Sequence, residues 1–129
     1  MPGFIAGALL FLSFLFVQAS MFSGQNVSEE DVIVYPEEVK TIIDRSCYSC
    51  HNSKSKGVKG KTAFNFDKLD KKKSLKQIGK LGKIIKKIEA DKMPPKKHIE
   101  ENADAALSAN DKKILIDWAN DQTKMLMNN

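Results

Sequence analysis

The chain has 129 residues, of which 42% are hydrophobic, and a formal net charge of +5. This length predicts one domain with a small hydrophobic core. A domain of this size is only marginally stable unless a disulfide, a metal or a cofactor also holds it together. The chain holds only two cysteines, which excludes any second disulfide or cysteine-based metal framework.

The N-terminal segment is almost wholly apolar and uncharged between residues 3 and 17. It resembles the hydrophobic region of a secretory signal peptide, and Val17 and Ala19 stand at the positions that a signal peptidase reads. We therefore predict a signal peptide over residues 1–19 and export to the bacterial periplasm or extracytoplasmic face. An uncleaved anchor is the alternative, and only then is the membrane a partner, although the run is shorter than the about 20 residues of a span.

Residues 20–33 are expected to form a flexible N-terminal segment, and the domain is expected to occupy residues 34–129. Its first helix begins near Pro36, which suits the first helical position, and acidic residues follow where the helix dipole favours them. Apolar residues then recur at helical spacing up to Cys47, namely Val39, Ile42 and Ile43.

The segment Cys47-Tyr48-Ser49-Cys50-His51 has the C-x-x-C-H spacing of a covalent c-type haem attachment site. On a turn of helix, both sulfurs can reach the two vinyl groups on one porphyrin edge and form thioethers. His51 would then be the proximal iron ligand. The motif predicts one covalently bound haem c per chain, and the porphyrin would complete a small core. Such haem is attached outside the bacterial cytoplasm, in agreement with the N-terminal segment.

The alternative reading of Cys47 and Cys50 is a redox-active dithiol. Thiol oxidoreductases usually carry this pair on a βαβ framework. The sequence shows no alternating strand pattern, so this reading is disfavoured.

The polar stretch from Asn52 to Asp70 is predicted to be a long loop that wraps around the porphyrin. It contains Phe64 and Phe66, which are candidate haem contacts or simple loop anchors.

A second helix is predicted with Ser74 as its N-cap. Lysines occupy its other faces, and its apolar stripe predicts a core-facing helix. The residues of the stripe are Leu75, Ile78, Leu81, Ile84, Ile85 and Ile88.

Met93-Pro94-Pro95 follows this helix, and the two prolines place Met93 on a stiff, extended segment. The Met93 thioether is the candidate sixth ligand opposite His51, because a soft sulfur suits the iron of an electron-transfer haem. The alternative to iron ligation is a structural role, in which Met93 only fills a gap in the core. His98 is a further candidate ligand, although a surface histidine in a charged loop is the simpler expectation.

The last helix is predicted to start at Ser108, with Asp111 in its first turn. Its inward-facing residues are expected to be Ile114, Leu115, Trp118 and Met125. With no strand pattern and no repeats, the fold is predicted to be all-α.

Charge is distributed unevenly along the chain. Residues 52–97 carry 16 lysines against four acidic residues, a net charge of +12, and acidic segments flank them. One interpretation is a solvated lysine-rich surface without a specific role. The other is a positive surface around the haem edge that steers an acidic redox partner. Nucleic acid is not expected as a partner, because few aromatic residues lie among the lysines.

Taken together, the C-x-x-C-H motif, Met93-Pro94-Pro95 and the flanking helices resemble a small class I c-type cytochrome. More narrowly, residues 34–120 are similar to the haem-binding domain of exported bacterial proteins. The resemblance implies an all-α, class I cytochrome c-like fold, in which crossed N- and C-terminal helices surround one covalently attached haem.

The expected function is a monohaem electron carrier with iron ligated by His51 and Met93, and not an enzyme. The alternatives are an exported haem-based redox or gas sensor, and the haem subunit of a larger enzyme.

Overall fold

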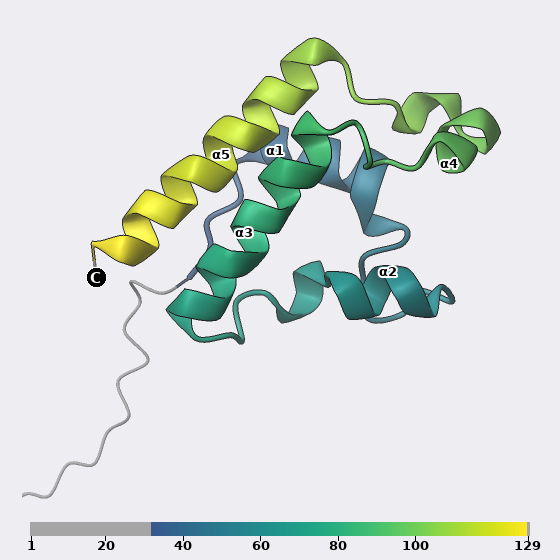
Figure 1. Cartoon of the computed structure of the whole chain (residues 1–129). Coiled ribbons are helices and arrows are strands. Elements are labelled where there is room, and N and C mark those ends of the chain that lie inside the picture. The colour runs from purple at the N-terminus through teal and green to yellow at the C-terminus, as the bar shows by residue number, and fades with distance from the viewer. Residues whose placement is uncertain (1–31, 129) are drawn as a thin grey trace, which may run out of the picture.

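The computed structural model describes residues 32–128, which form helices and no strand (Figure 1). The all-α prediction is therefore confirmed for this part of the chain. The α-helices are α1 (Glu37–Ile43), α2 (Val58–Ala63), α3 (Ser74–Glu89), α4 (Lys96–Glu101) and α5 (Ala109–Met127). Short helical turns are η2 (Asp44–Tyr48), η3 (Phe66–Lys68) and η4 (Ala103–Ala105).

The first helix continues into the cysteine motif, as predicted, but its geometry changes before it arrives there. Pro36 is the N-cap of α1. At Asp44 the helix widens into the π-helical turn η2, which contains Cys47. Single π-helical turns of this kind occur frequently at functional sites, because they re-aim the side chains of a regular helix.

Helices α3 and α5 lie side by side and form the main helix pair (Figure 1). Leu81 and Ile88 of α3 are buried, as are Leu115 and Leu126 of α5. The prediction for Leu75 was wrong, because this side chain is 84% exposed at the start of α3.

The two helices begin differently. The N-cap of α3 is Lys73, without a side-chain capping bond, so the prediction that Ser74 caps this helix was wrong. The predicted start of α5 is confirmed by a capping box. The Asp111 amide donates to Ser108 Oγ at 3.0 Å, and the Ser108 amide donates to Asp111 Oδ2 at 2.9 Å.

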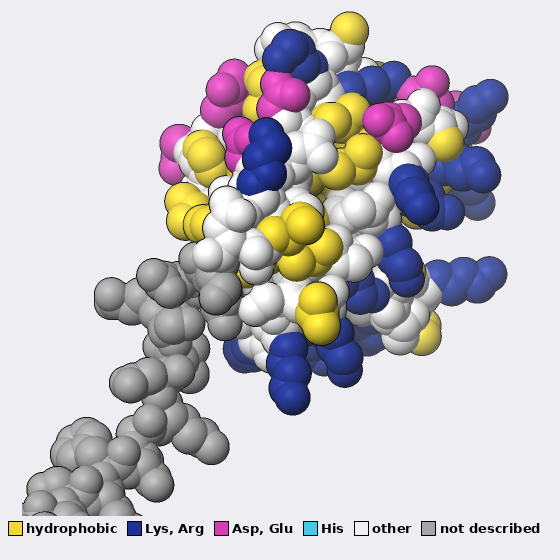
Figure 2. All heavy atoms as spheres, turned by 60° about the vertical axis from the view of Figure 1, so that its left-hand side comes forward, with side chains coloured by type: hydrophobic (Ala, Val, Ile, Leu, Met, Phe, Trp, Pro, Cys, Tyr) yellow, Lys and Arg dark blue, Asp and Glu magenta, His cyan; other side chains and the backbone are white. Residues whose placement is uncertain are grey.

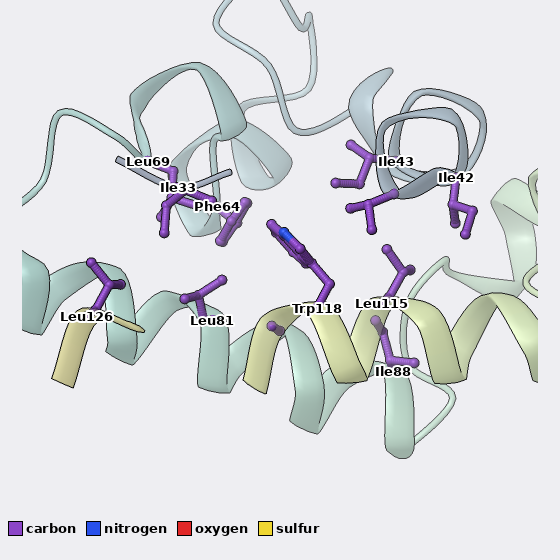
Figure 3. Close-up of a cluster of buried hydrophobic side chains, with 12 residues drawn as sticks. Ile33, Ile42, Ile43, Phe64, Leu69, Leu81, Ile88, Leu115, Trp118 and Leu126 are labelled. Carbon is purple, nitrogen blue, oxygen red and sulfur yellow. The ribbon is translucent and has the colours of Figure 1, made fainter. Parts of the chain in front are cut away.

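Trp118 joins the segment before α1 to α5. Its indole Nε1 donates to the Val34 carbonyl at 2.7 Å, and its ring lies 5.2 Å from that of Tyr35. The Val34 amide donates to Gln122 Oε1 at 2.8 Å. Figure 3 shows Trp118 pointing from α5 into the core, between Phe64 and Ile43. Both backbone groups of Val34 are therefore held by α5 side chains.

The structure contains two helices that the sequence analysis did not predict. The predicted loop from Asn52 to Asp70 contains α2 and η3, and the segment after the prolines contains α4. Both helices have six residues with no buried side chain, so they lack the apolar stripe that identifies a helix in sequence. The Lys80 ammonium of α3 donates to the Ala63 carbonyl at 2.6 Å and holds the end of α2 in place.

No helix within the described residues is long and apolar enough to cross a membrane. The predicted signal peptide at residues 1–19, and all of the 20–33 segment except its last two residues, lie outside the described residues.

Candidate functional site

A cavity of about 500 Å³ lies beside α3 and α5 and is bordered by α2 and α4. The predicted attachment residues Cys47 and Cys50 line it, together with the candidate iron ligands His51, Met93 and His98. The remaining walls are mostly apolar, and the volume falls in the roughly 300–1,000 Å³ range of small-molecule and cofactor sites. Residues from distant parts of the chain are thus brought together as the motif hypothesis requires.

The cysteine motif forms one tight turn at the edge of this cavity. The His51 and Cys50 amides both donate to the Cys47 carbonyl, at 3.1 and 3.2 Å. Both cysteines are free thiols, with Cys47 half-buried and Cys50 exposed. The turn therefore presents the two sulfurs and the imidazole to the same cavity.

The His51 ring is fixed by two backbone carbonyls. Its Nδ1 lies 2.9 Å from the Gly60 oxygen and 3.0 Å from the Phe64 oxygen. Since a carbonyl can only accept, Nδ1 must carry the proton, and Nε2 of the neutral ring keeps its lone pair. A histidine that donates one ring N–H to a carbonyl while its other nitrogen binds a metal is the usual arrangement in metal sites.

Gly60 is required at its position because the backbone passes unusually close to the motif. A Cβ atom placed there would lie 2.6 Å from the Cys50 carbonyl oxygen, well inside van der Waals contact. Sequence reasoning missed Gly60 as a site residue. Its only signal was a glycine within a polar stretch, which is typical of any loop.

The predicted aromatic contacts line the cavity beside His51. Phe64 lies with its ring 6.1 Å from the His51 ring, and Phe66 lies 4.7 Å from Phe64. The Phe66 amide donates to the His51 carbonyl at 3.0 Å. Backbone and ring contacts thus hold this segment against the motif.

Tyr48, inside the motif, adds a side-chain link to the same segment. Its hydroxyl donates to Asp67 Oδ1 at 2.6 Å, and the Ser53 amide donates to the other oxygen of that carboxylate. The hydrogen bond from Tyr48 is the main reason that the pKa of Asp67 lies below its ordinary value. The carboxylate is therefore ionised at neutral pH and holds three parts of the chain together.

Met93 and His98 reach the cavity from the segment that follows α3. Met93 is half-buried, and the neighbouring Pro94 is buried. His98 lies in α4 and is half-buried at the cavity wall. His98 was expected in a loop, but it lies in a helix, and α4 brings it to the edge of the cavity.

Other residues also line the cavity, among them Trp118, which was predicted only as core. Three lysines, Lys59, Lys83 and Lys87, which were predicted to belong to a lysine-rich surface, line it as well. Lys83 and Lys87 share one face of α3 at i, i+4 spacing, but nothing in the sequence placed that face at the cavity.

An ion pair connects the motif to the last helix. Arg45 of η2 donates to Asp111 Oδ2 at 2.8 Å, across 66 residues of sequence. Burial disfavours the charge on Asp111, but hydrogen bonds from Ser108 and Arg45 outweigh it and lower the pKa of this carboxyl. The start of α5 and the motif turn are thereby held together.

The chain belongs to the family of haem-binding domains, whose model matches residues 54–121, just over half of the sequence. This matched range is shorter than residues 34–120, over which the sequence analysis found the resemblance, and it begins after His51. Family membership and the cysteine motif are therefore separate observations that indicate the same cofactor. No curated protein and no solved structure matches the chain.

The residues present fit a haem. The cavity offers mainly apolar walls for a porphyrin, imidazole and thioether donors for iron, and two thiols at one edge. The ring of His51 is already held in the tautomer that iron binding requires. This is a haem-binding protein with an all-α fold.

Gly60→Ala tests the close approach of α2 to the motif. The Cβ atom would clash with the Cys50 carbonyl, so we expect a loss of about 1–3 kcal/mol in the free energy of unfolding, measured by urea denaturation. The shift of the Gly60 carbonyl away from His51 should also change the spectrum of bound haem.

Gly79→Ala in α3 is the matched control, because a Cβ atom there meets nothing within 4 Å. This variant should gain about 0.5–1 kcal/mol from helix propensity and keep the parent spectrum. Equal stability changes in the two variants would contradict a special role for Gly60.

Proposed function

We propose that this protein is a monohaem c-type cytochrome that carries single electrons between redox partners and is not itself an enzyme. The observation that carries the proposal is that Cys47, Cys50, His51 and Met93 line one apolar cavity in a chain of a haem-binding family. The haem would supply a one-electron change between ferric and ferrous iron.

In this proposal, Cys47 and Cys50 hold the porphyrin covalently. Each thiol would add across one vinyl double bond, forming an S–C bond and passing its hydrogen to the other vinyl carbon, without gain or loss of electrons. One haem c would then be bound per chain.

His51 would bind the iron through Nε2, and the Gly60 and Phe64 carbonyls keep its ring in one orientation. Met93, which two prolines follow, would be the second protein ligand. A methionine thioether raises the reduction potential and closes the iron to exogenous ligands. This closed coordination favours a carrier over a gas sensor or a haem catalyst, which need an open or labile position.

A dithiol function is disfavoured by the surroundings of Cys47. Burial is the main cause that raises the pKa of this thiol to about 11, although Arg45 opposes the shift. Redox-active cysteines have lowered pKa values, because the thiolate is the nucleophile. A half-buried, protonated thiol suits a structural thioether link better.

We further propose that the protein acts outside the cytoplasm, in the bacterial periplasm or on the extracytoplasmic face. This rests on the apolar sequence of residues 3–17 and on the site of c-type haem attachment.

An acidic redox protein is the proposed partner. Three exposed lysines, Lys92, Lys96 and Lys97, flank Met93 and its prolines without lining the cavity. Figure 2 shows Lys and Arg side chains without acidic neighbours along the lower part of one face, and acidic side chains mixed with cations in its upper part. Such an uneven distribution of charge orients an approaching partner of opposite sign.

The cysteine and histidine roles predict a graded loss of haem. Cys47→Ala or Cys50→Ala should leave one thioether, and the double variant should leave none, so that haem dissociates on denaturation. The readouts are haem staining of a denaturing gel and the pyridine haemochrome spectrum. His51→Ala should lose the low-spin spectrum, and a normal low-spin spectrum in this variant would contradict the motif assignment.

The sixth ligand is tested by Met93→Ala with His98→Ala as the matched comparison, since both side chains line the cavity. Met93→Ala should shift the iron toward high spin, admit carbon monoxide in the reduced state and lower the potential. His98→Ala should leave the spectrum unchanged. The opposite result would assign the ligand role to His98.

Steering of the partner is tested by changing Lys92, Lys96 and Lys97 together to Gln. We expect electron transfer to an acidic acceptor to slow by about tenfold at low salt. The difference from the parent should shrink near 0.1 M salt, where the screening length is about 10 Å. Stopped-flow kinetics over a series of ionic strengths measures both effects.

The control is Lys71, Lys72 and Lys73 changed to Gln, which removes the same charge at the opposite end of α3 from Met93. This control should keep most of the parent rate. Equal rates and salt slopes in the two triple variants would show that the lysines near Met93 are only a solvated surface.

A further inference from the structure

Three exposed lysines line the edge of an otherwise largely apolar cavity. Lys59 comes from α2, and Lys83 and Lys87 come from α3. No aspartate or glutamate is among the described residues that line the cavity. Two helices therefore supply positive charge to the cavity, and no acidic side chain among its described lining residues balances it.

These lysines are also unpaired elsewhere. Among residues 32–128, none of the three has an ion pair or a side-chain hydrogen bond, whereas the neighbouring Lys80 donates to the Ala63 carbonyl. Lys83 and Lys87 are four residues apart on α3, so their charges repel each other on one helix face. A ligand with negative charge would relieve this repulsion.

A haem supplies such charge, because it carries two propionate groups that are ionised near neutral pH. A carboxylate held against apolar walls needs a cationic partner, since its loss of hydration is otherwise uncompensated. We propose that Lys59, Lys83 and Lys87 form a propionate-binding subsite at the edge of the haem cavity.

The subsite distinguishes two sets of three lysines within the basic middle of the chain. Lys59, Lys83 and Lys87 line the cavity and act on the cofactor. Lys92, Lys96 and Lys97 lie outside it and are available to a partner. The proposal rests on haem binding alone, and neither the sixth ligand nor electron transfer enters it.

The test uses the full-length chain with Cys47→Ala and Cys50→Ala, in which ferric haem binds without thioether links. Lys83→Gln and Lys87→Gln are added to this background, and affinity is measured for ferric haem and for its dimethyl ester, which lacks free carboxylates. We expect the Kd for haem to rise about fivefold to tenfold, the size expected for two partly exposed ion pairs, with the Kd for the ester unchanged.

The matched control is Lys76→Gln with Lys86→Gln, which removes the same charge from α3. These two lysines are exposed, as Lys83 and Lys87 are, but they do not line the cavity. It should leave both affinities at the parent value. An equal change for haem and ester, or equal effects of the two lysine pairs, overturns the proposal. Unchanged haem affinity with slower electron transfer to an acidic acceptor also overturns it and assigns these lysines to partner docking.

If the cysteine-free background holds no haem, the covalent holoproteins decide the matter by resonance Raman spectroscopy. The propionate bending bands should shift in the Lys83→Gln, Lys87→Gln variant and not in the control pair. Bands that stay at the parent position overturn the proposal.

Discussion

The hydrogen bonds from the His51 imidazole to the Gly60 and Phe64 carbonyls are the constraint on which the rest of the site depends. They fix the tautomer that leaves Nε2 for a metal. They also require the chain to turn back onto the motif within nine residues, which only a glycine at position 60 permits. Helix α2 has no buried residue of its own, so these bonds and the Lys80 contact give a physical reason for its position.

The cavity and the hydrophobic core share their residues. Ile43, Ile88, Leu115 and Trp118 belong to the buried core and also line the cavity. A domain of this size has little apolar material to divide between a core and a separate binding site. Binding of an apolar group in the cavity is therefore coupled to folding, because such a ligand stabilises only the folded chain.

The sequence was sufficient for the parts of the structure that depend on local patterns. The α5 capping box, the inward face of α3 and the turn of Cys47 to His51 all follow from spacing and side-chain chemistry. Helices α2 and α4 could not be predicted, because six-residue helices without an apolar stripe are formed by tertiary contacts rather than by propensity. The role of Gly60 depends on a contact with the Cys50 carbonyl, and His98 reaches the cavity only because α4 forms.

The acidic residues of α5 and the lysines at the cavity differ in how their charges are compensated. Asp111, Asp117 and Asp121 of α5 are each paired with a cation, so much of the acidic charge on that helix is neutralised locally. The lysines at the cavity wall have no such partner in the described part of the chain. Positive charge beside iron disfavours the ferric state, and carboxylates favour it. Lysines paired with propionates would cancel much of each other's effect, which leaves the axial ligands as the main determinant of the reduction potential.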